Sequence, residues 1–361
     1  MNVNKTNKSG VTAVNQEFRR YDQVNKPQSY QLSEGHKMEE FDEDYEIKAC
    51  DISKYIEGSE ADKEAFSQEF GEALEGIGFA ILTGHGVDTN LYREAQESVR
   101  HLFENTTLEQ RMKFKYQRFG SINEGYFPMK ETTIIHPDLV EGWVFCRRAF
   151  NLNNEDKFDY DLFWPDKSYH DAFLPMVKAH EQLILPVMQS ILRFLKCPED
   201  HYNKKLTGTN FGFRLNYYPP ISGADDELGA GRMLGHEDVD LFTLLPAQEV
   251  EGLQVLNREN NKWIRLNPEP GSIILNTGDY MQRITNDRLP STTHRVSKPM
   301  TKDLYNKPRI SLPMAIYVWE DEILEVLPGT GKPKYEPISA IKFHTNITSK
   351  YYGDDYATDV K

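Results

Sequence analysis

The sequence predicts a mainly β protein of the mixed α+β class, with a helical N-terminal region, an antiparallel β core and a C-terminal helix. After about residue 208, short runs rich in β-formers alternate with Gly, Pro, Asn and Asp, which is typical of a sandwich or barrel. Before that point, apolar residues recur at helical spacing. From residue 336, EPISAIKFHTNITSKYYGDDY is expected to fold back over the core as a helix.

Composition and charge limit the class of protein. The 361 residues are 39% hydrophobic and 27% charged, and no apolar run is long enough to span a membrane. The first residues, MNVNKTNKSGVTAVNQ, lack the apolar region of a signal peptide. The net charge of −14 argues against unspecific nucleic-acid binding. Cys50, Cys146 and Cys197 are far apart and form no CxxC motif, so neither a disulfide framework nor a thiolate zinc site is indicated, and a cytoplasmic location is expected.

Changes in sequence texture divide the chain into four parts. Residues 1–45 are polar, end in the acidic run MEEFDEDY and are predicted to form a flexible arm. Residues 46–205 form the predicted helical region, and residues 206–345 the β core. Residues 346–361 are assigned to a C-terminal tail.

The helical region begins with EIKACDISKYI, a candidate short strand. A helix is predicted over 62–78, because Phe66, Phe70, Ala73 and Leu74 fall on one face before glycines end it. FAILTGHGV then reads as a buried strand that ends in a glycine turn.

Further helices are predicted in the rest of this region. Two lie over 90–106 and 107–115, and Thr107 is a candidate N-cap of the second. A long helix is predicted from about 168 to 196, with breaks or kinks at Pro175 and Pro186.

The expected strands of the core share β-rich composition and turn-forming boundaries. They are FGFRLNYYP, DLFTLLPA, EGLQVLN, KWIRLNP, GSIILNTGDYMQRIT, STTHRVSKP and RISLPMAIYVW.

A candidate metal site begins at LGHEDVDLF. His236 and Asp238 are two residues apart at the front edge of a strand, so their side chains can point the same way, while Glu237 is expected to leave by the other face as a solvated acid. His294 lies 56 residues beyond Asp238 (294 − 238), far enough for the chain to return across a barrel. Two histidines and one carboxylate with open positions form the triad that suits Fe(II), although a zinc hydrolase could use the same ligands.

Seven other histidines have no partner at ligand spacing and are interpreted as surface or core residues. They are His36, His101, His136, His170, His180, His201 and His344.

A candidate anion site favours the Fe(II) interpretation over a zinc hydrolase. Arg309 and Ser311 in RISLP share one face of a strand, and the planar guanidinium of a buried arginine is suited to a carboxylate. Upstream, the alternation in FRLNYYP places Arg214, Asn216 and Tyr218 together on one face. An interior with these groups beside a metal would hold a small dicarboxylate.

These motifs, in this order, resemble the isopenicillin N synthase-like family of iron- and 2-oxoglutarate-dependent oxygenases. The series over 211–318 is NYYP, HED, FTLLP, EGLQVL, PGSIILNTGDYMQ, STTHRV and RIS. DIS…F…ALEGIGFAILTGHGV, EGYFP (124–128) and PDLVEGWVF (137–145) resemble landmarks of the family's N-terminal half, and the similarity covers roughly 46–345.

The resemblance implies a double-stranded β-helix, or jelly roll, with a metal between its sheets. His236, Asp238 and His294 would then be the iron ligands. Arg309 and Ser311 would hold the distal carboxylate of 2-oxoglutarate, with Tyr218 and Asn216 as secondary contacts.

The activity that this resemblance implies uses O2 to hydroxylate, desaturate or cyclise a small organic metabolite and releases succinate and CO2, with ascorbate as a candidate reductant. No membrane or nucleic-acid partner is expected, and the protein is expected to be a monomer or a weak homodimer.

Two departures from the family pattern stand out. The link between His294 and Arg309 spans 15 residues (309 − 294) and contains KPMTKDLYNKP, longer than is usual. Val239-Asp240 follows the metal aspartate, where a glycine is common.

Two alternatives remain open at this point. One is an iron oxidase of the same family that does not use 2-oxoglutarate. The other is a catalytically silent jelly roll that binds metal. For the substrate, candidate pocket groups are Tyr126, the stretch from Trp143 to Arg148, and Tyr317, with Arg147-Arg148 either facing an acidic substrate or solvated.

Overall fold

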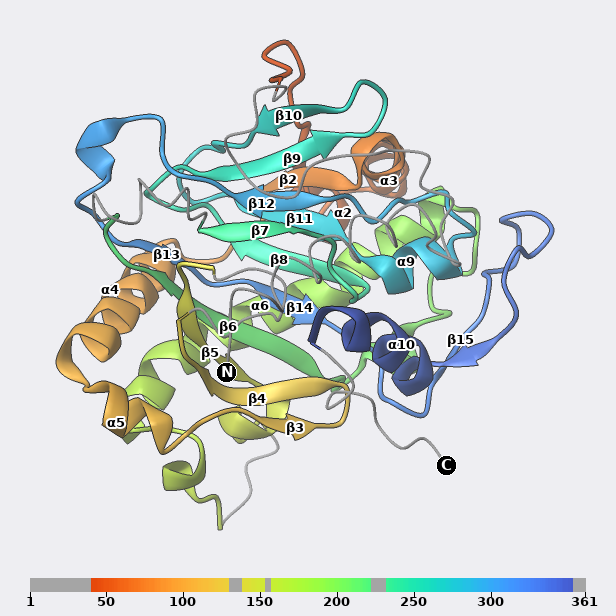
Figure 1. Ribbon diagram of the computed structural model, residues 1–361. Coiled ribbons are helices and arrows are strands. Elements are labelled where there is room, and N and C mark those ends of the chain that lie inside the picture. The colour runs from red at the N-terminus through yellow and green to blue at the C-terminus, as the bar shows by residue number, and fades with distance from the viewer. Residues whose placement is uncertain (1–39, 130–137, 153–156, 222–231, 353–361) are drawn as a thin grey trace.

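Two β-sheets packed face to face form the centre of the molecule (Figure 1). The computed structural model describes residues 40–129, 138–152, 157–221 and 232–352. Most of the predicted arm, His36, His136 and the end of the predicted tail lie outside these residues.

The larger sheet has ten strands. They are β1 (Ala49–Asp51), β2 (Phe79–Thr83), β3 (Gln117–Phe119), β4 (Ile122–Phe127), β5 (Glu141–Phe145), β6 (Phe211–Tyr218), β8 (Phe242–Pro246), β11 (Ile273–Thr277), β13 (Arg309–Ser311) and β14 (Met314–Ile316). Their order is β1-β2-β11-β8-β14-β6-β5-β4-β3, with β13 paired to β6. Strands β2 and β5 come from the predicted helical region and pair with β11 and β6 of the predicted core, so one sheet runs through both regions.

The smaller sheet covers part of the larger one. Its strands are β7 (Met233–His236), β9 (Leu253–Asn257), β10 (Lys262–Arg265) and β12 (His294–Val296), all antiparallel in the order β10-β9-β12-β7. Leu253 and Val255 of β9 pack against Phe79 and Ile274 of the larger sheet in a single apolar cluster. The two facing sheets form the predicted jelly roll.

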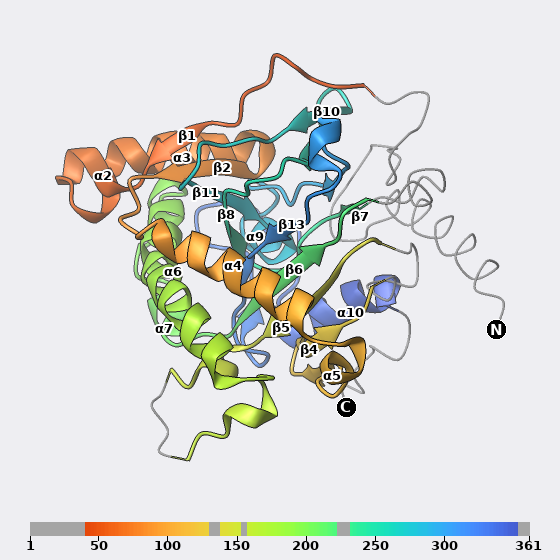
Figure 2. The ribbon, with the colours of Figure 1, turned by 90° about the vertical axis from the view of Figure 1, so that its left-hand side faces the viewer.

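Helices cover the outer face of the larger sheet. The helices are α2 (Ser53–Ile56), α3 (Glu60–Ile77), α4 (Asn90–Asn105), α5 (Leu108–Met112), α6 (Lys167–Phe194), α7 (Asn203–Leu206), α9 (Asp279–Ile284) and α10 (Ala340–Tyr352). Figure 2 shows α3, α4 and α6 together along one side of the sheet, with α10 on the other. Short 3-10 turns lie at Arg147–Phe150, Tyr160–Leu162 and Lys302–Leu304, and a two-residue pairing joins Ile323–Leu324 to Ile338–Ser339.

Local signals explain where two of these helices begin and end. Ser59 and Asp62 form a capping box at the start of α3, which ends at Gly78 in the left-handed conformation, φ 72°. The predicted N-cap Thr107 is confirmed, because its side chain accepts a hydrogen bond from the Gln110 N–H at the start of α5.

Two expectations for secondary structure were wrong. The expected breaks at Pro175 and Pro186 are wrong, because the long helix α6 is one continuous element that contains both, while the alternative expectation of kinks stays a prediction. The helix buries a wide apolar face against α3 and α4, and that packing outweighs the ~3 kcal/mol cost of an interior proline. The run over 271–285 is not all strand: β11 ends at Thr277, and the following helix α9 is buried on every side, a case in which periodicity cannot separate helix from strand.

The first expected strand is also shorter than EIKACDISKYI. Strand β1 covers only Ala49–Asp51, and Ser53–Ile56 begin a helical turn. Among the described residues, no helix has both the length and the apolar character that crossing a membrane requires.

Candidate active site

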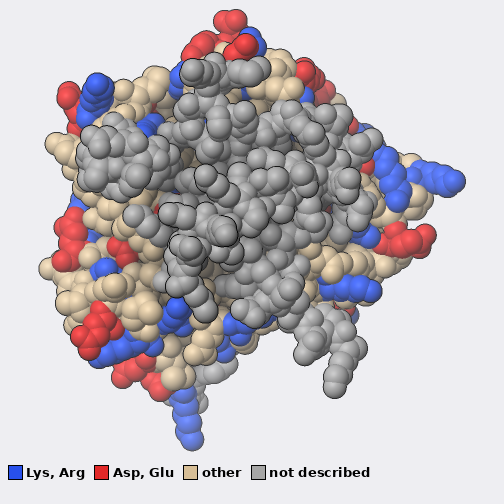
Figure 3. Space-filling view, viewed as in Figure 1, with Lys and Arg blue, Asp and Glu red and all other residues tan. Residues whose placement is uncertain are grey.

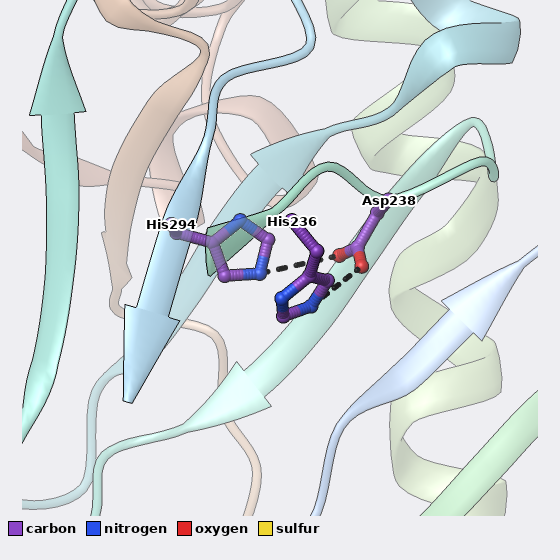
Figure 4. A group of neighbouring side chains, drawn as sticks. All are labelled: His236, Asp238 and His294. Atoms are coloured by element: carbon purple, nitrogen blue, oxygen red, sulfur yellow. Dashed lines mark ion pairs between the residues drawn. The ribbon is translucent and has the colours of Figure 1, made fainter. Parts of the chain in front are cut away.

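His236, Asp238 and His294 come together at the mouth of the jelly roll (Figure 4). Each offers one ligand atom, and these atoms all lie within 4.8 Å of one another. His236 ends β7 and His294 begins β12, and the two are directly paired in the antiparallel register. His236 Nε2 lies 3.7 Å from Asp238 Oδ1, and His294 Nε2 lies 3.9 Å from Asp238 Oδ2. The three donors converge on one point, as the ligands of a single metal ion must.

Outer contacts orient the donors. His294 Nδ1 lies 3.2 Å from the Thr292 carbonyl oxygen, which leaves Nε2 toward the cluster, and its ring meets Phe79 edge-on at 5.5 Å between centroids. A contact of this kind at the second ring nitrogen is how proteins set the orientation of a ligating histidine.

Asp238 is held by two donors from neighbouring strands. Its Oδ2 accepts hydrogen bonds from Asn276 Nδ2 at 2.8 Å and from Thr243 Oγ1 at 3.0 Å. Burial raises the pKa of Asp238, but His294, His236 and these two hydrogen bonds outweigh it, so the pKa lies below the usual aspartate value. The carboxylate is therefore ionised and ready to bind a cation. Asn276 and Thr243 were not anticipated from the sequence, although each is a polar residue inside an otherwise apolar strand.

Asp240 is a second carboxyl in the same network. It is fully buried, its Oδ2 lies 2.6 Å from Thr243 Oγ1, the same hydroxyl that contacts Asp238, and its Oδ1 has no hydrogen-bond partner among the described residues. Burial and then the charge of Asp238 raise the pKa of Asp240 well above its usual range, which favours the protonated form. The backbone of Gly278 packs directly against this carboxyl. A Cβ at Gly278 would lie 2.3 Å from Asp240 Oδ1 and 2.8 Å from the Asp238 carbonyl oxygen.

Glu237 is not the solvated acid that was expected. Its side chain is buried, and Oε1 accepts a hydrogen bond from Thr293 Oγ1 at 2.9 Å. Glu237 lies just beyond the end of β7, and Thr293, the residue before β12, contacts it there.

Arg309 lies deep in the same cavity. The residue is 1% exposed; its Nε donates to the Val250 carbonyl oxygen at 3.2 Å and its Nη2 to Gln248 Oε1 at 2.8 Å. Nη1 is buried with no hydrogen-bond partner among the described residues. Burial lowers the pKa of the guanidinium. An arginine fixed on one edge, with a buried donor left over, is arranged to receive an anion.

The other predicted co-substrate residues surround Arg309. In the antiparallel pairing of β13 with β6, Arg309 faces Tyr218 and Ser311 faces Asn216. Asn216 Nδ2 donates to Ser311 Oγ at 3.3 Å, and the Arg309 guanidinium carbon lies 5.1 Å from the Tyr218 ring centre. Asn216 Oδ1 is buried without a hydrogen-bond partner among the described residues.

One cavity of about 260 Å³ joins the triad to these groups. Its lining includes the three donors, Arg309, Ser311, Tyr218 and Asn216, together with Arg214 and Arg118. The lining also includes His344 of α10. The sequence predicted only a surface or core residue at this position, because no motif near residue 344 indicates that α10 returns to the cavity.

Of the expected substrate contacts, Tyr317 and Val144 line this cavity and the others do not. Tyr126 and Trp143 are buried in the apolar core, where the Tyr126 hydroxyl donates to Glu141 at 2.5 Å. Arg147 pairs with Glu181, and Arg148 pairs with Glu124 at 2.5 Å, so neither of these arginines faces the cavity.

The donor set fits a non-haem iron and its 2-oxo acid. Two imidazoles and one ionised carboxylate suit Fe(II) and leave positions for other ligands. The unsatisfied Arg309 Nη1 and Asn216 Oδ1 are polar atoms that a bound dicarboxylate and its solvent would satisfy.

Comparisons with known proteins agree with this geometry. The model of the 2OG-Fe(II) oxygenase superfamily matches residues 209–316, and that of the non-haem dioxygenase N-terminal region in morphine synthesis matches residues 47–167.

Similar proteins cover most of the chain. A bi-functional coumaroyl CoA and feruloyl CoA ortho-hydroxylase of Ruta graveolens is 28% identical, over 77% of this chain and 74% of its own. A 2-oxoglutarate-Fe(II) type oxidoreductase of Metarhizium majus is 28% identical, over 82% and 85%. Among solved structures, a Neurospora crassa protein in complex with alpha-KG and thymine has a TM-score of 0.74 at 22% identity, covering 84% of this chain and 97% of that one.

Proposed function

This chain belongs to the 2OG-Fe(II) oxygenase superfamily, and from that premise we propose that it oxidises a small organic metabolite, with hydroxylation as the main reaction. The enzyme uses Fe(II), 2-oxoglutarate and O2. The observation that carries the proposal is the single cavity that holds the convergent His236, Asp238 and His294 beside the buried Arg309.

In this proposal His236, Asp238 and His294 hold the iron. When bound, Fe(II) supplies the redox chemistry by which O2 and 2-oxoglutarate are consumed, succinate and CO2 are released and a substrate C–H bond is oxidised. Asn276 and Thr243 keep the Asp238 carboxylate ionised and aimed at the cluster. The protein supplies binding and orientation, and the cofactor supplies the difficult chemistry.

Arg309 fixes the position of 2-oxoglutarate in the proposed complex. Its Nη1 donates to the distal carboxylate, while Val250 and Gln248 prevent the guanidinium from moving toward the metal. Ser311 and Tyr218 add hydroxyl groups on the neighbouring positions, and Asn216 orients the Ser311 hydroxyl. Burial of Arg309 strengthens these charge-assisted contacts.

Hydroxylation is preferred to desaturation or ring closure because the Ruta graveolens relative is named as an ortho-hydroxylase. That relative acts on coumaroyl CoA and feruloyl CoA, whereas the substrate of the present enzyme is proposed only as a small metabolite.

The setting of the enzyme is also part of the proposal. We place it in the cytoplasm as a monomer or weak homodimer; the three cysteines, all buried as free thiols, support a reducing compartment. On the face seen in Figure 3, acidic and basic side chains alternate around the described rim, which supports a small-molecule partner over nucleic acid. Cell fractionation and size-exclusion chromatography test the compartment and the oligomeric state.

The decisive test is stoichiometric. Anaerobic enzyme is loaded with Fe(II) and 2-oxoglutarate, exposed to O2 with a metabolite extract, and assayed for succinate, CO2 and products that have gained one oxygen atom. One succinate per oxidised product is expected. Oxidised product without succinate would instead identify an oxidase that does not use 2-oxoglutarate, and no O2 consumption with any extract would contradict the proposed function.

A further inference from the structure

A second arginine faces the cavity that holds Arg309. Arg214 lies on β6 with Asn216 and Tyr218, on the strand face that lines the cavity. Since strands rise about 3.3 Å per residue, Arg214 sits ~7 Å from the Asn216 position and ~13 Å from the Tyr218 position that pairs with Arg309. The two guanidinium groups therefore serve different parts of the cavity.

The Arg214 guanidinium has no anionic partner among the described residues. Its Nε is buried without a hydrogen-bond partner, and its observed contact is with the Phe127 ring, whose centre lies 5.2 Å from the guanidinium carbon. Other arginines near the cavity differ: Arg118 donates to the Gly120 carbonyl oxygen at 2.9 Å and to Thr345 Oγ1 at 3.1 Å. A half-buried guanidinium that stacks on a ring, with its remaining edge toward a cavity, is arranged to bind a carboxylate.

The carboxylates of the cavity are engaged elsewhere. Asp238 lies between the two histidines of the triad. Asp138 also lines the cavity and has an interaction of its own. Glu237 is bonded to Thr293.

The walls near Arg214 are apolar and aromatic. Val144 pairs with Arg214 across β5 and β6, and Ile122, Phe127 and Tyr317 line the same part of the cavity. A ligand that matches both the Arg214 guanidinium and these apolar walls carries a negative group at one end and an apolar body beside it.

We propose that Arg214 binds the carboxylate of the substrate, so that the enzyme acts on small organic acids with an aromatic or similarly apolar body. This inference rests on the proposed function, because it takes the Arg309 end of the cavity as the site of 2-oxoglutarate. The two arginines then divide the anions between them: Arg309 takes the co-substrate and Arg214 takes the substrate, which presents its apolar body toward the triad.

Calorimetry tests the inference without turnover. Protein loaded with Mn(II) and 2-oxoglutarate under anaerobic conditions is titrated with benzoate, phenylacetate and 3-phenylpropanoate, and with the primary amide of each. At least one acid is expected to bind at least ~10-fold more tightly than its amide, the lower end of what charge-assisted hydrogen bonds contribute. Arg214→Gln should abolish that preference, and Arg214→Lys should retain part of it.

Arg265→Gln is the matched control. Arg265 also stacks on a phenylalanine, with its guanidinium carbon 3.5 Å from the Phe41 ring centre, but it lies on β10 outside the cavity. This variant loses the same charge and the same kind of stacking, and it should keep the acid preference.

Three results would overturn the inference: acids and amides that bind the wild type equally or not at all, a preference that survives in Arg214→Gln, or a loss of 2-oxoglutarate affinity in Arg214→Gln as large as in Arg309→Ala. Titrations with Mn(II) alone and then 2-oxoglutarate check the proposed function separately. If those fail, the premise is wrong; if they succeed while the acid preference is absent, only the role of Arg214 is wrong.

Discussion

His236 and His294 face each other as a directly paired position of β7 and β12, with their ring centres 4.4 Å apart. The strand pairing thus brings together two ligands that lie far apart in sequence, before any metal binds. Asp238 completes the cluster and lies in the segment that follows β7, two residues after His236. The site is held by backbone hydrogen bonds, and its preorganisation leads to the following predictions.

Removing a donor of the triad should remove metal binding. Loss of a residue that only orients a metal ligand lowers metal affinity by ~10–100-fold. Asp238→Ala and His294→Ala remove a ligand itself, so we expect a larger fall in Mn(II) affinity and loss of succinate formation. Anaerobic calorimetry measures the affinity. His201→Ala, at an exposed histidine outside the cavity, is the control and should bind Mn(II) as the wild type does. Full activity in Asp238→Ala would show that the triad is wrongly assigned.

Removing the co-substrate anchor should separate metal binding from 2-oxoglutarate binding. Arg309→Ala should weaken 2-oxoglutarate binding by ~100-fold, because loss of a buried charged partner costs about 2–5 kcal/mol. Mn(II) affinity should stay within about threefold of the wild type, since Arg309 is not among the metal donors. The apparent KM for 2-oxoglutarate and Mn(II) calorimetry measure the two effects. Unchanged 2-oxoglutarate affinity would contradict the assignment.

Gly278 should tolerate no side chain. A Cβ at this position would lie 2.3 Å from Asp240 Oδ1 and 2.8 Å from the Asp238 carbonyl oxygen. Gly278→Ala is expected to destabilise the fold by about 1–3 kcal/mol and to lower Mn(II) affinity, because the chain that carries Asp238 must shift. Urea denaturation and calorimetry measure both effects.

Gly76→Ala is the matched control for that substitution. In α3 its Cβ would meet only the Tyr45 hydroxyl, at 3.7 Å, which is an ordinary contact. Alanine in the last turn of this helix should leave the stability unchanged or raise it by at most about 0.5–1 kcal/mol. Equal destabilisation by both substitutions would argue against the steric account of Gly278.

His180 should contribute to acid sensitivity of the fold. Burial, and then the charge of His85, lowers the pKa of His180 to about 3, while in the unfolded chain it titrates near 6.5. Between these values the unfolded state binds the extra proton, so the free energy of unfolding falls, and the fold becomes less stable, as pH falls from about 6.5 toward 3. The contribution is about 1.4 kcal/mol per pH unit at most.

Urea denaturation at pH 7, 6 and 5 tests this prediction. His180→Gln should flatten the decline in stability below pH 6.5 relative to the wild type, whatever its effect at pH 7. The exposed His201→Gln should leave the slope unchanged. A slope that is the same in all three proteins would mean that His180 is not a source of the acid sensitivity.

The spacing of polar residues on strands was the part of the site that sequence could predict. His236 and Asp238 two apart, Arg309 and Ser311 two apart, and the alternation of Arg214, Asn216 and Tyr218 are local patterns, and period-2 geometry gives them a direction. The structure brings all of these groups to one cavity. Helix capping at Thr107 was predictable for the same reason, since its partner Gln110 is three residues away.

Predictions failed where the outcome depended on contacts between distant segments. Pro175 and Pro186 break isolated helices, but packing of α6 against α3 and α4 keeps this one continuous. Arg147 and Arg148 were expected either to face an acidic substrate or to be solvated, but they pair with Glu181 and Glu124, which are distant in sequence. Glu237 read as exposed because the sequence does not show that Thr293 covers it.

The sequence by itself predicted the order of helical and β-rich regions from residue type and short-range periodicity. The ordered motifs and their family resemblance added the proposed metal donors and the proposed contacts of 2-oxoglutarate. Only the tertiary structure decided that Asn276 and Thr243 hold Asp238, that Asp240 is a buried acid beside it, and that His344 of α10 reaches the same cavity. These features arise from strand pairing and burial between segments tens of residues apart, and no local pattern encodes such contacts.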